Sequence, residues 1–505
     1  MRTLAARRLL GGCALLLGAC APDDTPRARA ADGGSDGATA QAQPEASDDP
    51  PLVLRITQPD TGDWPAIERR GLLRVLVPRD RTNFFFAENR LRGMEYELVH
   101  EFEQSLARGA GSTRPQIDVA YVPVEFDRLL PALVEGLGDV AAGGLTITAA
   151  REQEVAFTEP YLTDVTEIVV ASSSAPQLAG PESLAGQLVI VGQGSSYLAS
   201  LEHLNRQLVE RGLQPARVET PGRGFSTEDM LELVNSGAFP YTVADQHVAE
   251  LWAEVLPGVR LQPEVKLAVG GRIAWAVRRD NPELKAVLDA FLVEHRKGTR
   301  TGNVLFTKYF QDTTWIDTPD VDLHAGKLGA ILAPLQRLSA EHGFDWRLIA
   351  AQAWQESHLD PDARSGAGAI GLMQLLPSTA KDMGFDDVTG VEDNLAAGIK
   401  YMAWLRDEWF ADPALPEEVR VDFALAAYNA GPGRVRRWRR EAPERGLDPD
   451  RWSGGVENLA LEEVGLQPVR YVANINKYFV ILARLLDERE RRDQEMEKLG
   501  AGNRR

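Results

Sequence analysis

The feature that most constrains the fold is a change of pattern near residue 325. Between about residues 66 and 311, short apolar segments typical of strands alternate with amphipathic segments typical of helices. From Leu328 onward the segments are helical, with very few strand signals. Alternating strands and helices indicate an α/β domain, whereas the later pattern predicts an all-α domain. We therefore expect two domains of different fold class, which suits a chain of 505 residues.

The α/β region begins with a strand and a helix that are easily located. Residues 73–77 form a short apolar run, and residues 94–107 have helical spacing with Leu98, Phe102 and Leu106 on one face. The segments GLLRVLV, GMEYELVHEFE and FDRLLPALVEGLGDVAAGGLTITAAREQEVAFTEPY then follow one another in that order. This order resembles the family-3 extracellular solute-binding domain, the type that binds amino acids.

That resemblance implies two α/β lobes around a cleft, joined by hinge strands, in a non-catalytic and regulatory domain. Lobe one would hold residues 66–168 and 268–311, and lobe two residues 169–267. In the amino-acid binders an arginine grips the ligand carboxylate, and an aspartate of lobe two holds the ligand amine. The matching positions in this chain are Arg151 and Asp245.

The chemistry of this pair suits a zwitterion. A planar guanidinium pairs with a carboxylate through two hydrogen bonds, and a buried aspartate pairs with an ammonium. Without the resemblance, Arg151 and Asp245 would be ordinary surface charges. Gly143 and Gly144 stand where such binders often carry small hydroxyl residues. The departure predicts an altered cleft or a larger ligand, such as a cell-wall peptide.

The helical region contains the stretch QESHLDPDARSGAGAIGLMQLLPSTA, in which Glu356 is the residue of interest. Asp345 is a good N-cap for a helix that runs to Glu356 or Ser357. At the C-terminal end of a helix the dipole disfavours a carboxylate, and the neighbouring Trp354 would desolvate it. Both effects predict a raised pKa for Glu356, which is what a general acid needs. The glycines let the following loop pass close to the carboxyl, and Pro377 suits a first helical turn.

A glutamate at a helix end is by itself an ordinary solvated residue. Here the stretch is followed by ALAAYNAGPGRV and RYVANINKY, and the three motifs together resemble the catalytic domain of soluble lytic murein transglycosylases. The resemblance covers about residues 325–487 and implies an all-α, lysozyme-like fold. The matching site positions are Glu356 as the single catalytic acid/base, Ser357 as its substrate-orienting neighbour, Met373 and Gln374 in the loop that lines the sugar cleft, Tyr428 and Asn429 beside the scissile bond, and Tyr471, which reaches the catalytic glutamate. For Met373 and Tyr471 the alternative is core packing.

The mechanism that the resemblance implies needs only one carboxyl group. Ordinary glycosidases use two carboxylates, but the motifs here hold no second one, since Asp360 and Asp362 lie on the outgoing loop. In the family, the glutamate protonates the oxygen between N-acetylmuramic acid (MurNAc) and N-acetylglucosamine (GlcNAc). It then takes the proton of the muramoyl 6-hydroxyl, which closes a 1,6-anhydro ring. No cofactor is expected, and the histidine spacing offers no zinc signature.

The N-terminus predicts export and lipidation. Arg2, Arg7 and Arg8 precede a short apolar run, residues 9–19, that is too short to span a bilayer and is typical of a secretory signal. The run ends in LGAC, which resembles a lipoprotein cleavage site with acylation of Cys20. The alternative is a plain cleaved signal in which the cysteine is incidental. Several acyl chains would give stable membrane anchoring.

The residues after Cys20 extend this prediction. Ala21, in place of an acidic residue, resembles the sorting pattern for the outer membrane, so we expect an anchored protein on its periplasmic face. Residues 20–62 are rich in small and polar residues and predict a disordered tether, whose reach is about 35 Å. Cys13 lies in the removed segment, so no disulfide framework is expected.

The combined features resemble the F-type membrane-bound lytic murein transglycosylases. The expected organisation is a lipoprotein signal peptide (1–19), a tether (20–62), a solute-binding-like domain (63–312), a linker (313–325), a catalytic domain (326–487) and a charged tail (488–505). The expected partners are peptidoglycan glycan strands, the membrane through the lipid anchor, and an amino acid or muropeptide in the N-terminal domain. A net charge of −19 argues against nucleic acid.

Two other interpretations stay open on the sequence. One is a binding protein for an amino-acid importer that carries an inactive helical domain. The other is a lysozyme-like hydrolase on the same helical fold. The first would keep its activity without the Glu356 carboxyl, and the second would release reducing sugars in place of anhydro rings.

Overall fold

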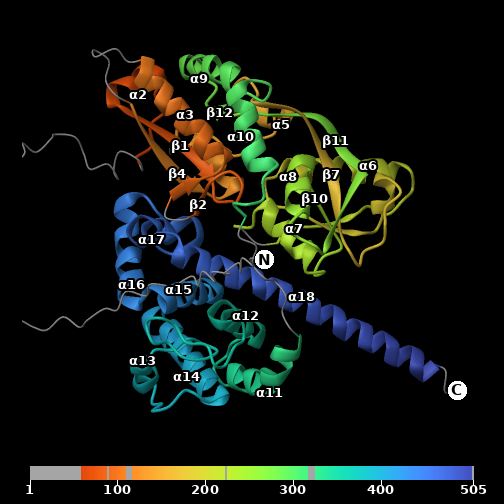
Figure 1. Cartoon of the computed structure of the whole chain (residues 1–505), viewed down its shortest axis with the longest axis vertical. Coiled ribbons are helices and arrows are strands. Elements are labelled where there is room, and N and C mark those ends of the chain that lie inside the picture. Colours follow the sequence, from red (N-terminus) through yellow and green to blue (C-terminus); the bar gives the residue numbers. More distant parts are fainter. Residues whose placement is uncertain (1–57, 88–89, 110–116, 222–223, 317–324, 503–505) are drawn as a thin grey trace, which may run out of the picture. The chain divides into compact units, whose positions relative to one another are not determined.

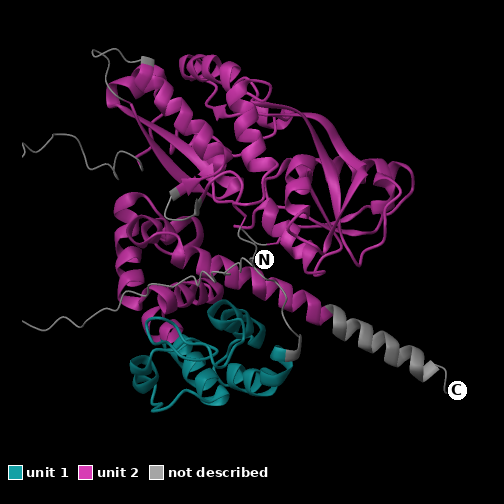
Figure 2. Cartoon of the chain, in the orientation of Figure 1, with its two compact units in different colours: residues 1–52, 324–404 teal, residues 53–323, 405–505 magenta. Residues whose placement is uncertain are grey.

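The computed structural model describes residues 58–502 apart from four short gaps, 88–89, 110–116, 222–223 and 317–324 (Figure 1). The predicted signal peptide, Cys20, most of the tether and most of the linker lie outside the described residues. These residues divide into two compact units, coloured separately in Figure 2. The first unit ends at Trp404 and the second resumes at Leu405, so both contain part of the predicted catalytic domain.

The second unit begins with the sheet of lobe one, in the order β4-β1-β5-β12-β6. β1 (Leu72–Pro78) lies between β4 (Asp118–Val124) and β5 (Val140–Ala141) and is parallel to both. β12 (Ala276–Val277) pairs antiparallel with β5 and with β6 (Ala156–Phe157). Every residue of β1 is buried, as expected for a strand with helices on both faces. The strand predicted at residues 73–77 is therefore confirmed.

Helices cover both faces of this sheet, and the amphipathic helix predicted at 94–107 is confirmed as α3. The helices of lobe one are α2 (Trp64–Arg70), α3 (Met94–Gly109), η1 (Phe126–Arg128), α4 (Leu129–Val134), α5 (Ala149–Glu154), α9 (Pro282–His295) and α10 (Arg300–Phe310), and a small hairpin pairs β2 (Phe85–Ala87) with β3 (Arg90–Arg92).

Lobe two has its own sheet, in the order β11-β7-β10-β8-β9. β7 (Leu162–Ser172) pairs antiparallel with β10 (Tyr241–Asp245) and β11 (Val259–Ile273), while β8 (Leu188–Ile190) is parallel to β10 and to β9 (Arg217–Glu219). β7 follows β6 and β11 precedes β12, so these two long strands connect the lobes (Figure 1). They are the predicted hinge strands.

Two hydrophobic clusters, one on each face of the sheet, form the core of lobe two. Trp252 is fully buried in one of them, and Leu201 and Leu208 lie in the other. The helices of this lobe are η2 (Pro181–Leu184), α6 (Ser196–Glu210), α7 (Thr227–Asn235) and α8 (Gln246–Ala253).

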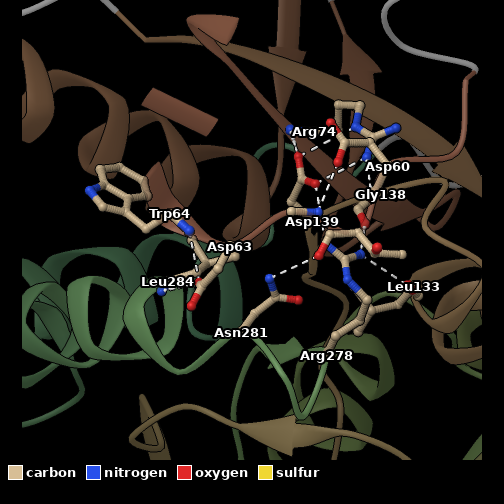
Figure 3. Close-up of polar contacts among 12 residues, drawn as sticks. Asp60, Asp63, Trp64, Arg74, Leu133, Gly138, Asp139, Arg278, Asn281 and Leu284 are labelled. Atoms are coloured by element: carbon tan, nitrogen blue, oxygen red, sulfur yellow. Dashed lines mark hydrogen bonds and ion pairs between the residues drawn. The ribbon is translucent and has the colours of Figure 1, made fainter. Parts of the chain in front are cut away.

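A buried ion cluster fastens the start of the described chain to lobe one (Figure 3). Asp139, fully buried before β5, accepts from the backbone N–H of Arg74 at 2.8 Å and from its Nη2 at 3.0 Å. Arg70 and Arg278 approach the same carboxylate, and Arg74 also donates to the carbonyl of Asp60 at 2.9 Å. Both oxygens of Asp139 therefore have cationic partners, which offsets the cost of burying its charge.

The second unit ends in a helical subdomain. α15 (Glu417–Ala430) contacts α16 (Pro432–Glu441) and α18 (Gln467–Gly502), and α17 (Glu457–Val464) also contacts α18. Trp438 is fully buried in this subdomain. The shorter helices here are η3 (Leu405–Trp409), η4 (Ala442–Arg445) and η5 (Trp452–Val456).

Buried ion pairs join the helical subdomain to lobe two within the second unit. Lys477 of α18 is 3% exposed, and its Nζ lies 2.7 Å from a carboxylate oxygen of Glu232 and 3.4 Å from one of Asp229. Arg81 of lobe one pairs with the same Glu232. One carboxylate on α7 therefore contacts cations from lobe one and from α18.

The first unit is helical, as predicted from the pattern after Leu328. Its helices are α11 (Ala325–Glu341), α12 (Trp346–Ser357), α13 (Pro377–Asp382) and α14 (Val391–Trp404), and α11 contacts both α12 and α14. Asp345 caps α12 and Pro377 is the first residue of α13, which confirms both predictions. In the part of the chain that the structure describes, no helix combines the length and apolar character needed to cross a membrane.

Candidate active site and ligand cleft

Glu356 lies in the last turn of α12 and is half-buried. The helix starts because the Asp345 carboxylate accepts from the backbone N–H of Arg347 at 2.9 Å. It stops because His358 and Leu359 both adopt left-handed backbone conformations, with φ of 52° and 56°. The chain therefore turns away directly after the helix and leaves the Glu356 carboxyl at its negative end. This confirms the position that the sequence predicted for Glu356.

Ser357 ties the end of α12 to the glycine-rich loop. The side chain is 8% exposed, and its Oγ lies 3.1 Å from the carbonyl oxygen of Ala353 and 3.0 Å from that of Leu372. The second contact fixes the distance between the helix end and the loop. Ser357 thus positions the loop that was predicted to line the sugar cleft.

Asn394 of α14 holds the loop from the other side, and sequence reasoning missed it. Its Oδ1 accepts from the backbone N–H of Met373 at 2.8 Å. Its Nδ2 donates to the carbonyls of Ile370 at 2.9 Å and Val388 at 3.0 Å. A Cβ at Gly371, where φ is 74°, would lie 2.5 Å from this amide, so the loop needs glycine there. A polar residue inside an otherwise apolar helix face was the available signal.

Met373 and Gln374 both face inward within the first unit. Met373 is fully buried, and a Cβ at Gly398 would lie 2.7 Å from its side chain, so the thioether packs closely on α14. Gln374 has a φ of 45°, and its Nε2 donates to the carbonyls of Gly371 at 2.8 Å and Ala363 at 3.2 Å. These contacts hold the loop in shape. Contact of either side chain with glycan stays a prediction.

Tyr428, Asn429 and Tyr471 belong to the second unit. Tyr428 and Asn429 are half-buried in the last turn of α15, which ends at Gly431 with a φ of 90°. Tyr471 is 4% exposed near the start of α18. Their placement beside the Glu356 carboxyl stays a prediction.

Asp422 of α15 is a further titratable group in this subdomain. Its Oδ1 accepts from the side-chain amide of Asn476 at 3.0 Å, which joins α15 to the RYVANINKY segment of α18. Burial raises the pKa of Asp422 to about 6. The carboxyl therefore links two helices that carry predicted site residues.

Arg151 lies in α5 of lobe one and is the first residue of the candidate ligand site. Thr148 caps α5, and the guanidinium donates from Nη1 to the Thr146 carbonyl at 2.7 Å and from Nη2 to the Gly194 carbonyl of lobe two at 2.9 Å. Burial lowers the pKa of this guanidinium, although the carboxylates of Glu167 and Asp245 oppose the effect. Arg151 thus lies where the two lobes meet.

Asp245 ends β10 and is 5% exposed. Its backbone N–H donates to the Tyr197 hydroxyl at 3.1 Å. Burial raises the pKa of Asp245 to about 8, and the nearby negative charge of Glu167 acts in the same direction. Arg151 opposes this rise, so the structure brings the predicted arginine and aspartate within electrostatic range of each other.

Glu167 is a further buried carboxylate beside Asp245 that the sequence analysis missed. It is 4% exposed, and the β7–β10 register places it directly opposite Asp245. Residues opposite each other on paired strands project to the same face. The hydroxyl of Ser196 donates to its Oε1 at 2.7 Å. The available signal was a single acidic residue inside the apolar strand segment EIVVAS.

The two glycines that distinguish this cleft have structural explanations. A Cβ at Gly143 would lie 2.8 Å from side-chain atoms of Leu129 and Pro78. Gly144 has a φ of 65°, and its backbone N–H donates to the buried Glu95 carboxylate at 2.7 Å. Close packing at Gly143 and the buried carboxylate that bonds Gly144 therefore account for glycine where such binders often carry small hydroxyl residues.

Comparison with known families assigns both domains. Residues 73–312 match the model for bacterial extracellular solute-binding proteins, family 3, and residues 334–449 match the transglycosylase SLT domain. Among solved structures, an ancestral arginine-binding protein bound to arginine is 26% identical, with a TM-score of 0.40 over 48% of this chain and 99% of that chain. The substrate-binding protein AbpA from Streptococcus pneumoniae, bound to L-arginine, is 19% identical, with a TM-score of 0.43 over 50% of this chain and 100% of that chain.

Two curated relatives match almost their full length. Membrane-bound lytic murein transglycosylase F of Desulfosudis oleivorans is 32% identical over 82% of this chain and 91% of the relative. The protein of the same name from Maricaulis maris is 33% identical over 88% of this chain and 96% of the relative. These matches confirm the predicted fold class, a two-lobed periplasmic-binding-protein-like domain followed by an all-α lysozyme-like transglycosylase domain. The chain belongs to the membrane-bound lytic murein transglycosylase F family.

Proposed function

We propose that this peptidoglycan lytic transglycosylase cleaves the MurNAc-β-1,4-GlcNAc bond without water and leaves 1,6-anhydroMurNAc ends. The observation that carries the proposal is the Glu356 carboxyl in the last turn of α12, with Ser357 joined to the Leu372 carbonyl of the following loop at 3.0 Å. Family membership supports the reaction class. The biological role would be turnover and remodelling of the cell wall.

The reaction needs Glu356 twice. The protonated carboxyl first gives its proton to the bridging oxygen as the C1–O bond breaks, and GlcNAc leaves with a free hydroxyl. The resulting carboxylate then takes the proton of the muramoyl 6-hydroxyl while that oxygen bonds to C1. The proton count returns to its starting value, so one carboxyl completes the cycle. The helix C-terminus favours the protonated form at the start.

The surroundings of Glu356 within the first unit favour this single-carboxyl scheme. Asp360 and Asp362 follow on the outgoing loop, and both are exposed. The Oδ1 of Asp360 accepts from the backbone N–H of Asp362 at 3.0 Å and so shapes the turn. A two-carboxylate hydrolase would need a second buried or cleft-facing carboxyl opposite the acid. Asp360 and Asp362 are exposed and instead shape the turn of the outgoing loop.

The role of Glu356 is tested with purified sacculi. Glu356→Gln keeps the size and hydrogen bonding of the side chain but removes the proton, so muropeptide release should fall at least about 100-fold. Glu341→Gln, at an exposed position of α11 in the same unit, is the matched control and should keep wild-type activity. Equal release by wild type and Glu356→Gln would refute the catalytic assignment.

For location, we propose a lipid anchor at Cys20 on the periplasmic face of the outer membrane. The support is the LGAC sequence with Ala21 after it, and membership of a family named as membrane-bound. Mass spectrometry of the mature N-terminus should find an acylated Cys20, and Cys20→Ala should move the protein from the membrane fraction to the soluble fraction. An unmodified N-terminus at another residue would refute the anchor.

For the N-terminal domain, we propose that a small amino-acid-like ligand or muropeptide binds between Arg151 and Asp245 and modulates catalysis. The support is the family-3 match and the electrostatic contact of these two residues across the cleft. Modulation requires that the ligand bind two states of the protein with different affinity. Candidate peptides that neither bind nor alter the rate of sacculus digestion would remove this proposal.

A further inference from the structure

The cleft of the solute-binding domain carries more negative charge than a simple amino acid would neutralise. Glu167 and Asp245 lie directly opposite each other on β7 and β10, and they are 4% and 5% exposed. One oxygen of each carboxylate has a neighbouring donor or cation, but among the residues that the structure describes Oε2 of Glu167 and Oδ1 of Asp245 have no hydrogen-bond partner, and both are buried. Burying such atoms costs free energy unless a ligand supplies their hydrogen-bond partners.

Hydrogen bonds join these carboxylates to the arginine in one connected cluster. Arg151 donates to the carbonyl of Gly194, and Ser196, two residues later, donates to Glu167. Tyr197, the next residue, accepts from the backbone N–H of Asp245. The start of α6 and the loop before it therefore contact both the lobe-one guanidinium and the two lobe-two carboxylates.

The charges of this cluster do not balance. Arg151 contributes one positive charge, and Glu167 and Asp245 contribute two negative charges when both are ionised. A zwitterionic amino acid adds nothing to that sum, so one negative charge would stay buried. An amino acid with a second cationic group adds one positive charge and brings the sum to zero. Buried charges persist in proteins when they are paired, so the balanced ligand is favoured.

Without a ligand, a proton on Asp245 supplies the missing positive charge. The pKa of Asp245 is raised to about 8 by burial and by Glu167, so its carboxyl is largely protonated at neutral pH. The titratable groups that interact with it are Glu167 of β7, Tyr197 of α6, Arg151 of α5 and Tyr161, directly before β7. A bound cation would displace this proton, because it stabilises the ionised form.

We propose that the N-terminal domain binds an amino acid, or a peptide residue, that carries a second cationic group, with Glu167 as the residue that selects it. This inference rests on the proposed ligand site of Arg151 and Asp245. Arg151 takes the ligand carboxylate, Asp245 the α-ammonium and Glu167 the second cation. Glu167 lies on hinge strand β7, so the second cation binds at the strand that connects the lobes.

The test uses isothermal titration calorimetry with the mature full-length chain and two probes, L-lysine and L-norleucine. Norleucine has the aliphatic part of the lysine side chain without its ammonium. We expect wild type to bind lysine about 100-fold more tightly than norleucine, since a buried charge pair gains that much over an unpaired charge. Lysine binding at pH 7 should also release protons, which appears as a binding heat that depends on the buffer.

Glu167→Gln is the decisive variant. It should lose most of the preference for lysine and keep its affinity for norleucine, which also shows that the variant is folded. Glu264→Gln, an exposed position on the neighbouring hinge strand β11, is the matched control and should keep the wild-type preference. Equal affinity of wild type for both probes, no binding of either, or an unchanged preference in Glu167→Gln would each overturn the inference.

Sacculus digestion by the same wild-type preparation separates this inference from the proposed enzyme function. Digestion without lysine preference refutes the ligand class and leaves the transglycosylase intact. Lysine preference without digestion supports the ligand class and refutes the catalytic proposal.

Discussion

Asp139 in lobe one and Asp245 in lobe two are both buried aspartates next to a sheet strand, yet their surroundings are opposite. Asp139 is fully buried and contacts Arg70, Arg74 and Arg278. Figure 3 shows the last two of these arginines beside it. Asp245 is 5% exposed and faces another carboxylate, and one of its oxygens has no hydrogen-bond partner in the described part of the chain. A satisfied carboxylate holds structure together, whereas an unsatisfied one destabilises the empty protein and is explained by a ligand.

From the difference between these two aspartates, we expect the largest change in stability on substitution of Asp139. Asp139→Ala would leave three arginines around an empty site, and removing one partner from a buried ion cluster costs about 3–5 kcal/mol. The free energy of unfolding, measured by urea denaturation, should fall by that amount. Asp118→Ala, at an exposed position on the adjacent strand β4, is the control and should change it by less than about 1 kcal/mol. An Asp139→Ala protein as stable as wild type would contradict the structural role.

Lys477 provides an intermediate case, because its substitution leaves Glu232 with a second cationic partner. Lys477→Met removes the ammonium 2.7 Å from Glu232 but leaves Arg81 paired with the same carboxylate. We expect a loss of about 2 kcal/mol, smaller than at Asp139 because the charge keeps one partner. Thermal unfolding followed by circular dichroism measures it. A loss as large as that of Asp139→Ala would show that Arg81 does not compensate.

Asp245 should behave in the opposite way to Asp139. In Asp245→Asn the amide can donate to Glu167, so the variant should be more stable than wild type at pH 8 by about 1–3 kcal/mol. The pKa of Asp245 in the folded protein is about 8, above the ordinary value of 3.8. The wild-type protein therefore becomes less stable as the pH rises from 4 to 8, because the buried carboxyl ionises. The advantage of the variant should therefore vanish near pH 4. Urea denaturation at both pH values checks the sign, and an advantage independent of pH would contradict it.

The smallest expected effect concerns Ser357 in the other unit. Ser357→Ala loses the contacts with the carbonyls of Ala353 and Leu372 and should cost about 1 kcal/mol of unfolding free energy. Because the loop position depends on the second contact, sacculus digestion should also slow, by less than in Glu356→Gln. Ser357→Thr, which keeps the hydroxyl, should recover part of the rate. An Ala variant with the wild-type rate would show that the contact does not position the loop.

Much of this could be predicted from sequence because the signals are local. The N-cap Asp345, the N1 residue Pro377 and the apolar run of β1 act on neighbouring residues, and all three were found where expected. Family motifs gave Glu356 and the Arg151–Asp245 pair, and the structure places the former at a helix end and the latter within electrostatic range of each other.

The missed residues depend on contacts between distant segments. Glu167 faces Asp245 only because β7 and β10 pair in one register, and a shift of one residue would point it to the other face. Asn394 reaches the loop at Met373 only through the packing of α14. The burial of Met373 could not be predicted either. Its side chain is fully buried, and a sequence motif does not reveal such packing.

The most direct test of the central claim is the mass of the muropeptides that the purified enzyme releases from sacculi. A single-carboxyl transglycosylase should give products lighter by one water than the corresponding hydrolysis products, with 1,6-anhydroMurNAc ends and no new reducing sugar. Glu356→Gln should give at least about 100-fold less of these products. Hydrolysis products with reducing ends, or an undiminished yield of anhydro products from the Glu356→Gln variant, would contradict the account.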